Sequence, residues 1–185
     1  MKRLVLSLFP LVILSRSFCT PLLDADSTEK VGGAIAVVQQ FYRWYSENCT
    51  ELSSEGFLRD GGVQGKQYEI DFRKVDQFLN RLVSTGLFSE TFPPKVNAFF
   101  ARCNEKMFAM NQTEGPPIDL NYDIIFCSQE YDLTPEFVDF FTFSDVLMSG
   151  SRITMKINTP YEWVNTATLI LTDRGWKIDR ICEIK

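Results

Sequence analysis

Residues 151–184 read SRITMKINTPYEWVNTATLILTDRGWKIDRICEI, and this stretch decides the fold class. At its start isoleucine and methionine alternate with polar residues, which is the pattern of a half-buried strand. Turns follow at short intervals, one near Pro160 and one that ends at Gly175, where a tight hairpin favours a residue that tolerates positive φ. The stretch therefore predicts three consecutive strands, over about residues 151–159, 162–172 and 176–184.

A further strand is expected just before this stretch. Residues 140–148, FFTFSDVLM, are joined to it by a turn at Ser149 and Gly150. Four strands connected by short turns predict an antiparallel meander. Because helical patterns occupy the chain before the strands, we expect an α+β fold with the N-terminal helices packed on one face of a curved, four-stranded antiparallel sheet.

The first helical pattern runs from about residue 33 to residue 48. Ala34, Val38, Phe41 and Tyr45 fall on one stripe that would face a core. A second group of apolar residues makes this stripe unusually wide, so we expect the helix to be enclosed on several sides. That second group consists of Ile35, Val37, Tyr42 and Trp44.

Two more helices are expected, over about residues 70–84 and 93–110, with a glycine-rich connector over residues 53–67. The connector lacks the spacing of a phosphate-binding loop. Residues 34–185 have the length of a single domain, and we expect residues 20–33 to form a flexible leader.

The N-terminus has the order of a secretory signal peptide, which we place at residues 1–19. Lys2 and Arg3 precede an apolar run of about half the length that a bilayer-spanning helix needs. We therefore expect an exported protein of the periplasm or cell envelope without a transmembrane segment. Cys19 stands where a bacterial lipoprotein carries its lipidated cysteine, although residues 16–18 fit poorly with the small residues usual before it.

The charge of the chain argues against nucleic acid as a partner. The formal net charge is −5, and removing residues 1–19 would make it −8 because Lys2, Arg3 and Arg16 are lost with no acid. A negative protein is repelled by nucleic acids and by anionic membrane surfaces.

Four cysteines follow the signal region, and an even number in an exported protein allows three pairing schemes. Cys103 and Cys127 are the nearest pair in sequence and are the pair we expect, while buried free thiols stay an alternative. The two remaining cysteines are Cys49 and Cys182.

Three phrases give the chain a family resemblance: VVQQFYRWY at residues 37–45, DLNYDIIFCSQEYD at residues 119–132 and LILTDRGWKIDRI at residues 169–181. Over residues 34–184 it resembles the cone-shaped, cystatin-like superfamily named after nuclear transport factor two, and within it a family of exported bacterial proteins of unknown function. The resemblance implies a curved sheet wrapped around the first helix. Enzymes of that superfamily commonly use an aspartate base with a tyrosine donor in the cavity.

The composition limits the chemistry. There is no histidine, which removes histidine-activated nucleophiles and histidine metal sites, and we expect no metal and no cofactor. Aspartates and tyrosines could serve an enzyme of the resembled kind, although such residues more often cap turns or fill cores. These candidates are Asp123, Asp132, Asp139, Asp145, Tyr42, Tyr45 and Tyr122.

We therefore expect a non-catalytic module that binds a small apolar ligand, a peptide or a partner protein in a cavity whose rim is the loop at residues 119–132. An aspartate-dependent isomerase or hydrolase and a structural homodimer paired through the sheet are the alternatives. The residues expected to line the cavity and its rim are Tyr42, Tyr45, Tyr122, Asp123, Phe126 and Trp163.

Overall fold

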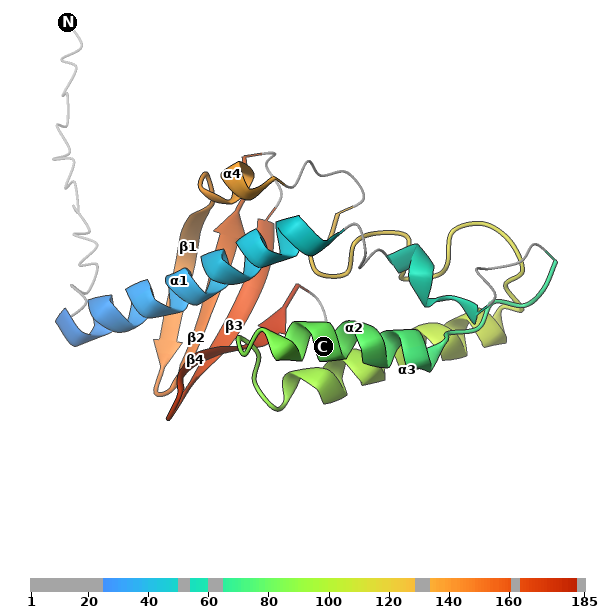
Figure 1. The fold of residues 1–185 in the computed structure, drawn as a ribbon, viewed down its shortest axis with the longest axis horizontal. Coiled ribbons are helices and arrows are strands. Elements are labelled where there is room, and N and C mark those ends of the chain that lie inside the picture. The colour runs from blue at the N-terminus through green and yellow to red at the C-terminus, as the bar shows by residue number, and fades with distance from the viewer. Residues whose placement is uncertain (1–24, 50–53, 60–64, 129–133, 161–163, 183–185) are drawn as a thin grey trace, which may run out of the picture.

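The computed structural model describes residues 25–49, 54–59, 65–128, 134–160 and 164–182. Figure 1 shows a long helix lying across one face of a twisted sheet, with two further helices side by side beyond it. In order, the elements are α1 (Ala25–Asn48), η2 (Ser54–Phe57), α2 (Phe72–Ser84), α3 (Phe92–Ala109), α4 (Pro135–Val138), β1 (Thr142–Ser149), β2 (Arg152–Asn158), β3 (Val164–Thr172) and β4 (Gly175–Ile181).

The four strands form one antiparallel sheet in the order β1-β2-β3-β4, which confirms the predicted meander. The inward positions of β2 and the middle of β3 are closed to solvent, as the alternation of residue types predicts. Two register shifts interrupt the ladder, one between Ser144 and Leu147 of β1 and one between Thr168 and Leu169 of β3. Such bulges bend strands and increase their twist.

The free edge of β4 is covered by the segment between α2 and α3. The Ile178 N–H donates to the Leu87 carbonyl at 2.8 Å, and the Ser89 N–H donates to the Ile178 carbonyl at 2.9 Å. This short parallel bridge satisfies backbone groups that an open edge would leave unpaired. It also joins the α2 and α3 pair to the sheet.

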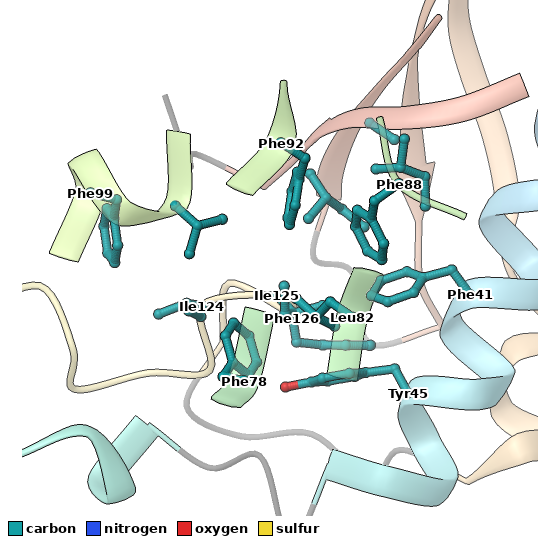
Figure 2. Packing of buried hydrophobic residues seen from close by; sticks show 14 of the residues in the cluster. Phe41, Tyr45, Phe78, Leu82, Phe88, Phe92, Phe99, Ile124, Ile125 and Phe126 are labelled. Atoms are coloured by element: carbon teal, nitrogen blue, oxygen red, sulfur yellow. The ribbon is translucent and has the colours of Figure 1, made fainter. Parts of the chain in front are cut away.

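The width of the apolar stripe on α1 is explained by two different neighbours. On one side, Phe41 meets the ring of Phe88 edge-on at 4.9 Å. On another, Tyr42 meets Phe126 at 5.4 Å and Phe141 at 5.3 Å. Figure 2 shows rings from α1, from α2 and α3 and from the loop at residues 124–126 gathered into one cluster. The helix is therefore enclosed on several sides, as predicted.

The N-terminal part of α1 approaches the sheet closely. A Cβ at Gly33 would lie 3.3 Å from the indole ring of Trp176 on β4, so a residue without a side chain allows the contact. The helix begins at Ala25, so the expected start near residue 33 is wrong. Residues 25–33, expected as a flexible leader, are helical, and residues 1–24 lie outside the described part of the chain.

Candidate functional site

A small group of polar side chains lies inside the aromatic core, where α1, the loop at residues 118–128 and β3 meet. Tyr42 and Tyr45 lie three positions apart on α1 and are 0% and 1% exposed. Asp123 belongs to the loop and Asn165 to β3, and they are 9% and 3% exposed. Buried polar groups need partners, so their hydrogen bonds show what each group does.

Asp123 organises the loop. Its Oδ1 accepts from the backbone N–H groups of Ile125 at 2.9 Å and Phe126 at 2.7 Å, and its Oδ2 accepts from the Tyr45 hydroxyl at 2.6 Å. A carboxylate that accepts from the backbone two and three residues later forms a local turn. Through these contacts Asp123 fixes the loop against α1.

Tyr42 links the loop to the sheet. Its hydroxyl donates to the Ile125 carbonyl over 3.4 Å and accepts from Asn165 Nδ2 over 3.3 Å. Burial strongly raises the pKa of Tyr42, the hydrogen bond from Asn165 lowers it by less, and the charge of Asp123 adds to the rise. The hydroxyl therefore keeps its proton and acts as a donor.

A disulfide ties the same loop to the end of β4. It joins Cys127 to Cys182, 55 residues apart in sequence, with a Cα–Cα distance of 6.0 Å. The expected pairing of Cys103 with Cys127 is therefore wrong. Cys103 is a buried free thiol of α3 and Cys49 is a half-buried free thiol. The nearest pair in sequence is not the nearest in space, because the end of the meander returns to the loop.

Beside the disulfide lies a cavity of about 360 Å³. It opens between the loop and the first residues of β3, and its lining combines one aromatic ring, the disulfide, an aliphatic side chain, an amide and a hydroxyl. The residues that line it are Tyr122, Cys127, Val164, Asn165, Thr166 and Cys182. No carboxylate or cation is among these lining residues.

Five of the six residues expected at the cavity are described, and they divide into three groups. Tyr122 is half-buried and lines the cavity. Tyr42, Tyr45 and Phe126 lie in the core, and Phe126 is 0% exposed, so its expected place at a rim is wrong. Asp123 is next to the lining and holds the turn. Trp163 lies outside the described residues.

The other candidate aspartates are apart from this cavity. Asp139 pairs with Arg43 at 2.5 Å and Asp145 pairs with Lys156 at 2.6 Å, and both carboxylates are mostly exposed. Asp132 lies outside the described residues.

A cluster of charged and hydroxyl side chains around Asp179 was not predicted. Asp179 is 2% exposed and is the bulged residue of β4, because Ile178 pairs with Leu169 and Arg180 pairs with Thr168. It accepts from Lys95 Nζ at 2.6 Å, Arg152 at 3.1 Å and the Ser89 hydroxyl at 3.1 Å, and also from Thr91. These contacts fasten the start of α3 to the sheet, which is a structural role.

Asn165 and Thr166 were also missed as cavity residues. Asn165 faces the core side of β3 together with Ala167 and Leu169, which are 0% exposed. An amide at an inward position of an otherwise apolar strand face was the available signal.

Among the described residues there is no group of three or more side chains placed to hold a metal ion. No helix in the described ranges has the length and apolar character needed to cross a bilayer. Comparisons with protein-family models, with curated proteins and with solved structures found no match to this chain.

Proposed function

We propose that this protein is a non-catalytic binding module that holds a small ligand in the cavity beside the disulfide. The cavity itself carries the proposal, because its volume of about 360 Å³ lies within the range of small-molecule sites. Val164, the disulfide and the Tyr122 ring offer apolar surface, and Asn165 and Thr166 offer polar groups. This lining suits a ligand with an apolar body and one polar edge.

The alternative of an aspartate-dependent enzyme at this site is not favoured. Both oxygens of Asp123 are held by the turn and by Tyr45, and Asp123 is not among the lining residues. A base needs a carboxylate within reach of the bound substrate.

We also propose that the chain is exported and has the cone-shaped architecture of the nuclear transport factor two-like superfamily. Three observations support this: the signal-type order of residues 1–19, a disulfide of the kind that persists in oxidising compartments, and a helix packed on an antiparallel sheet with two bulges. A lipid anchor at Cys19, a protein partner and a homodimer paired through the sheet stay predictions.

The binding proposal is tested by fragment titration followed with protein NMR. We expect saturable shifts that gather at residues 122–127, 164–166 and 182. Tyr122→Ala should weaken the binding of these fragments about tenfold, since it removes the aromatic side chain from the cavity lining. Phe108→Ala is the matched control, because Phe108 is 46% exposed on α3 and does not line the cavity. Shifts scattered over the surface, or none that saturate, would refute the proposal.

A further inference from the structure

Among the described residues, Asn165 is the one side chain that belongs both to the cavity lining and to the buried polar group of Tyr42, Tyr45, Asp123 and Asn165. It lines the cavity and is 3% exposed. Its backbone pairs with Ile157 of β2 inside the β2–β3 ladder, next to the end pair of Asn158 and Val164, so the sheet holds its position. A polar group held on a rigid strand is a good recognition element, because little ordering is needed when a ligand binds.

The orientation of the Asn165 amide follows from Tyr42. The Tyr42 hydroxyl has a single hydrogen, and the Ile125 carbonyl, 3.4 Å away, can only accept. Tyr42 must therefore donate to Ile125 and accept from Asn165, whose Nδ2 lies 3.3 Å away. This places the amide nitrogen toward Tyr42 and leaves the amide oxygen for another partner.

That partner is not found in the described part of the protein. Among the described residues, the Asn165 amide makes one hydrogen bond, from Nδ2 to the Tyr42 hydroxyl, and its oxygen accepts none. The Asn165 amide oxygen is not fully enclosed either. Among the described residues, Arg180 Nε is the one fully enclosed side-chain nitrogen or oxygen without a hydrogen-bond partner, so Asn165 Oδ1 keeps some accessible surface. An oxygen that is unpartnered but not enclosed, on a residue that lines a cavity, borders that cavity.

We infer that the ligand of this cavity donates a hydrogen bond from an uncharged N–H or O–H group to Asn165 Oδ1. This inference rests on the proposed function, since it names the class of ligand that the same cavity takes. The donor would sit on an aromatic or aliphatic body that packs on Tyr122 and Val164. Heteroaromatic N–H compounds, phenols and amides are members of this class.

The lack of charge in the ligand follows from the lining. The described residues that line the cavity carry no formal charge, so a charged ligand group would lose its hydration without a counter-charge from them. The nearby carboxylate, Asp123, is already engaged by Tyr45 and two backbone N–H groups. A carboxylate ligand fails for a second reason, because it has no hydrogen to give to Asn165 Oδ1.

The test uses pairs of isomers that differ in the donor and share size and apolar character. One pair is 3-methylindole, which has an N–H, and 1-methylindole, which has none. The other pair is 4-ethylphenol and 4-methylanisole. Binding to the full chain with its disulfide intact is followed by NMR titration. We expect the donor isomer of each pair to bind about tenfold more tightly, since the other isomer leaves the amide oxygen unpaired.

Two variants assign the preference to one side chain. Asn165→Leu keeps the approximate volume and should make the two isomers of each pair bind equally. Thr166→Val removes the neighbouring lining hydroxyl and should keep the tenfold preference. The comparison of isomers in the unaltered protein decides the matter even where a variant folds poorly.

The outcomes separate this inference from the proposed function. Tighter binding of both donor isomers, lost in Asn165→Leu, supports the inference. Saturable binding at the cavity with equal affinity within each pair overturns the inference and leaves the binding function standing. No saturable binding by any of the four compounds overturns both.

Discussion

Replacing Asp179 with asparagine tests the contact that fastens α3 to the sheet. The change keeps the shape of the side chain but removes the negative charge that Lys95 and Arg152 share. Those two cations would then lie next to a neutral amide. We expect Asp179→Asn to lower the free energy of unfolding by about 2 kcal/mol at pH 7.

The magnitude comes from the pKa of the carboxyl group. Burial raises the pKa of Asp179, but hydrogen bonds from Lys95, Thr91 and Ser89 outweigh it and hold the value at about 2, against an ordinary 3.8. One pKa unit corresponds to about 1.4 kcal/mol, which gives a little over 2 kcal/mol. The expected loss in the free energy of unfolding is set at about 2 kcal/mol, because the Arg152 side chain is 52% exposed and solvent screens its charge.

The sign of the pH dependence follows from the lowered pKa. The folded protein holds the Asp179 proton less tightly than the unfolded chain, so the stabilisation is complete above about pH 4 and is lost as the pH falls toward 2. The unaltered protein and Asp179→Asn should therefore differ most at neutral pH and converge near pH 2.

Urea unfolding followed by circular dichroism at pH 7, 4, 3 and 2 measures this difference. Asp145→Asn is the matched control, because its ion pair with Lys156 has side chains 61% and 51% exposed and should contribute less than about 1 kcal/mol. A loss below about 0.5 kcal/mol for Asp179→Asn at pH 7, or a difference that stays constant down to pH 2, would refute the reasoning.

Three further predictions concern the cysteines and α1. The double change of Cys127 and Cys182 to serine should cost about 4 kcal/mol in urea unfolding, from the entropy of a loop of 55 residues, and an unchanged midpoint would contradict it. Burial raises the pKa of Cys103 to about 12, so mass spectrometry should find it unlabelled by thiol reagents at pH 8 until the chain unfolds. Phe41→Ala should lower the free energy of unfolding by about 3 to 5 kcal/mol, and Trp44→Ala by about half as much, because Trp44 is only half-buried. Equal losses for the two variants would contradict this expectation.

The difference between Phe41 and Trp44 shows the limit of periodicity. The spacing of apolar residues predicted a helix enclosed on several sides, and Phe41, Tyr42 and Tyr45 are indeed closed to solvent. Periodicity does not show where enclosure ends, because Trp44 belongs to the same widened apolar stripe and is only half-buried. The same limit applies to the loop before the sheet. Its apolar residues Ile125 and Phe126 were recognised from the sequence, but their directions depend on the turn that Asp123 makes.

The sequence by itself determined the local elements and their order. Alternation of apolar and polar residues has a period set by the strand backbone, and Gly150 and Gly175 have the positive φ that short hairpins need, so the antiparallel meander was readable without a structure. The helices at residues 72–84 and 92–109 followed from their spacing in the same way. Each of these features depends on residues within a few positions of one another.

Only the tertiary structure decided which distant groups meet. The disulfide joins residues 55 positions apart, and Tyr42 bonds to Asn165 across 123 positions. Such contacts depend on how α1, the loop and β3 pack together, and packing is set by the summed shape of many side chains and by no local pattern. For this reason the cavity lies beside the disulfide, while Tyr42 and Tyr45, which were expected to line it, are buried in the core.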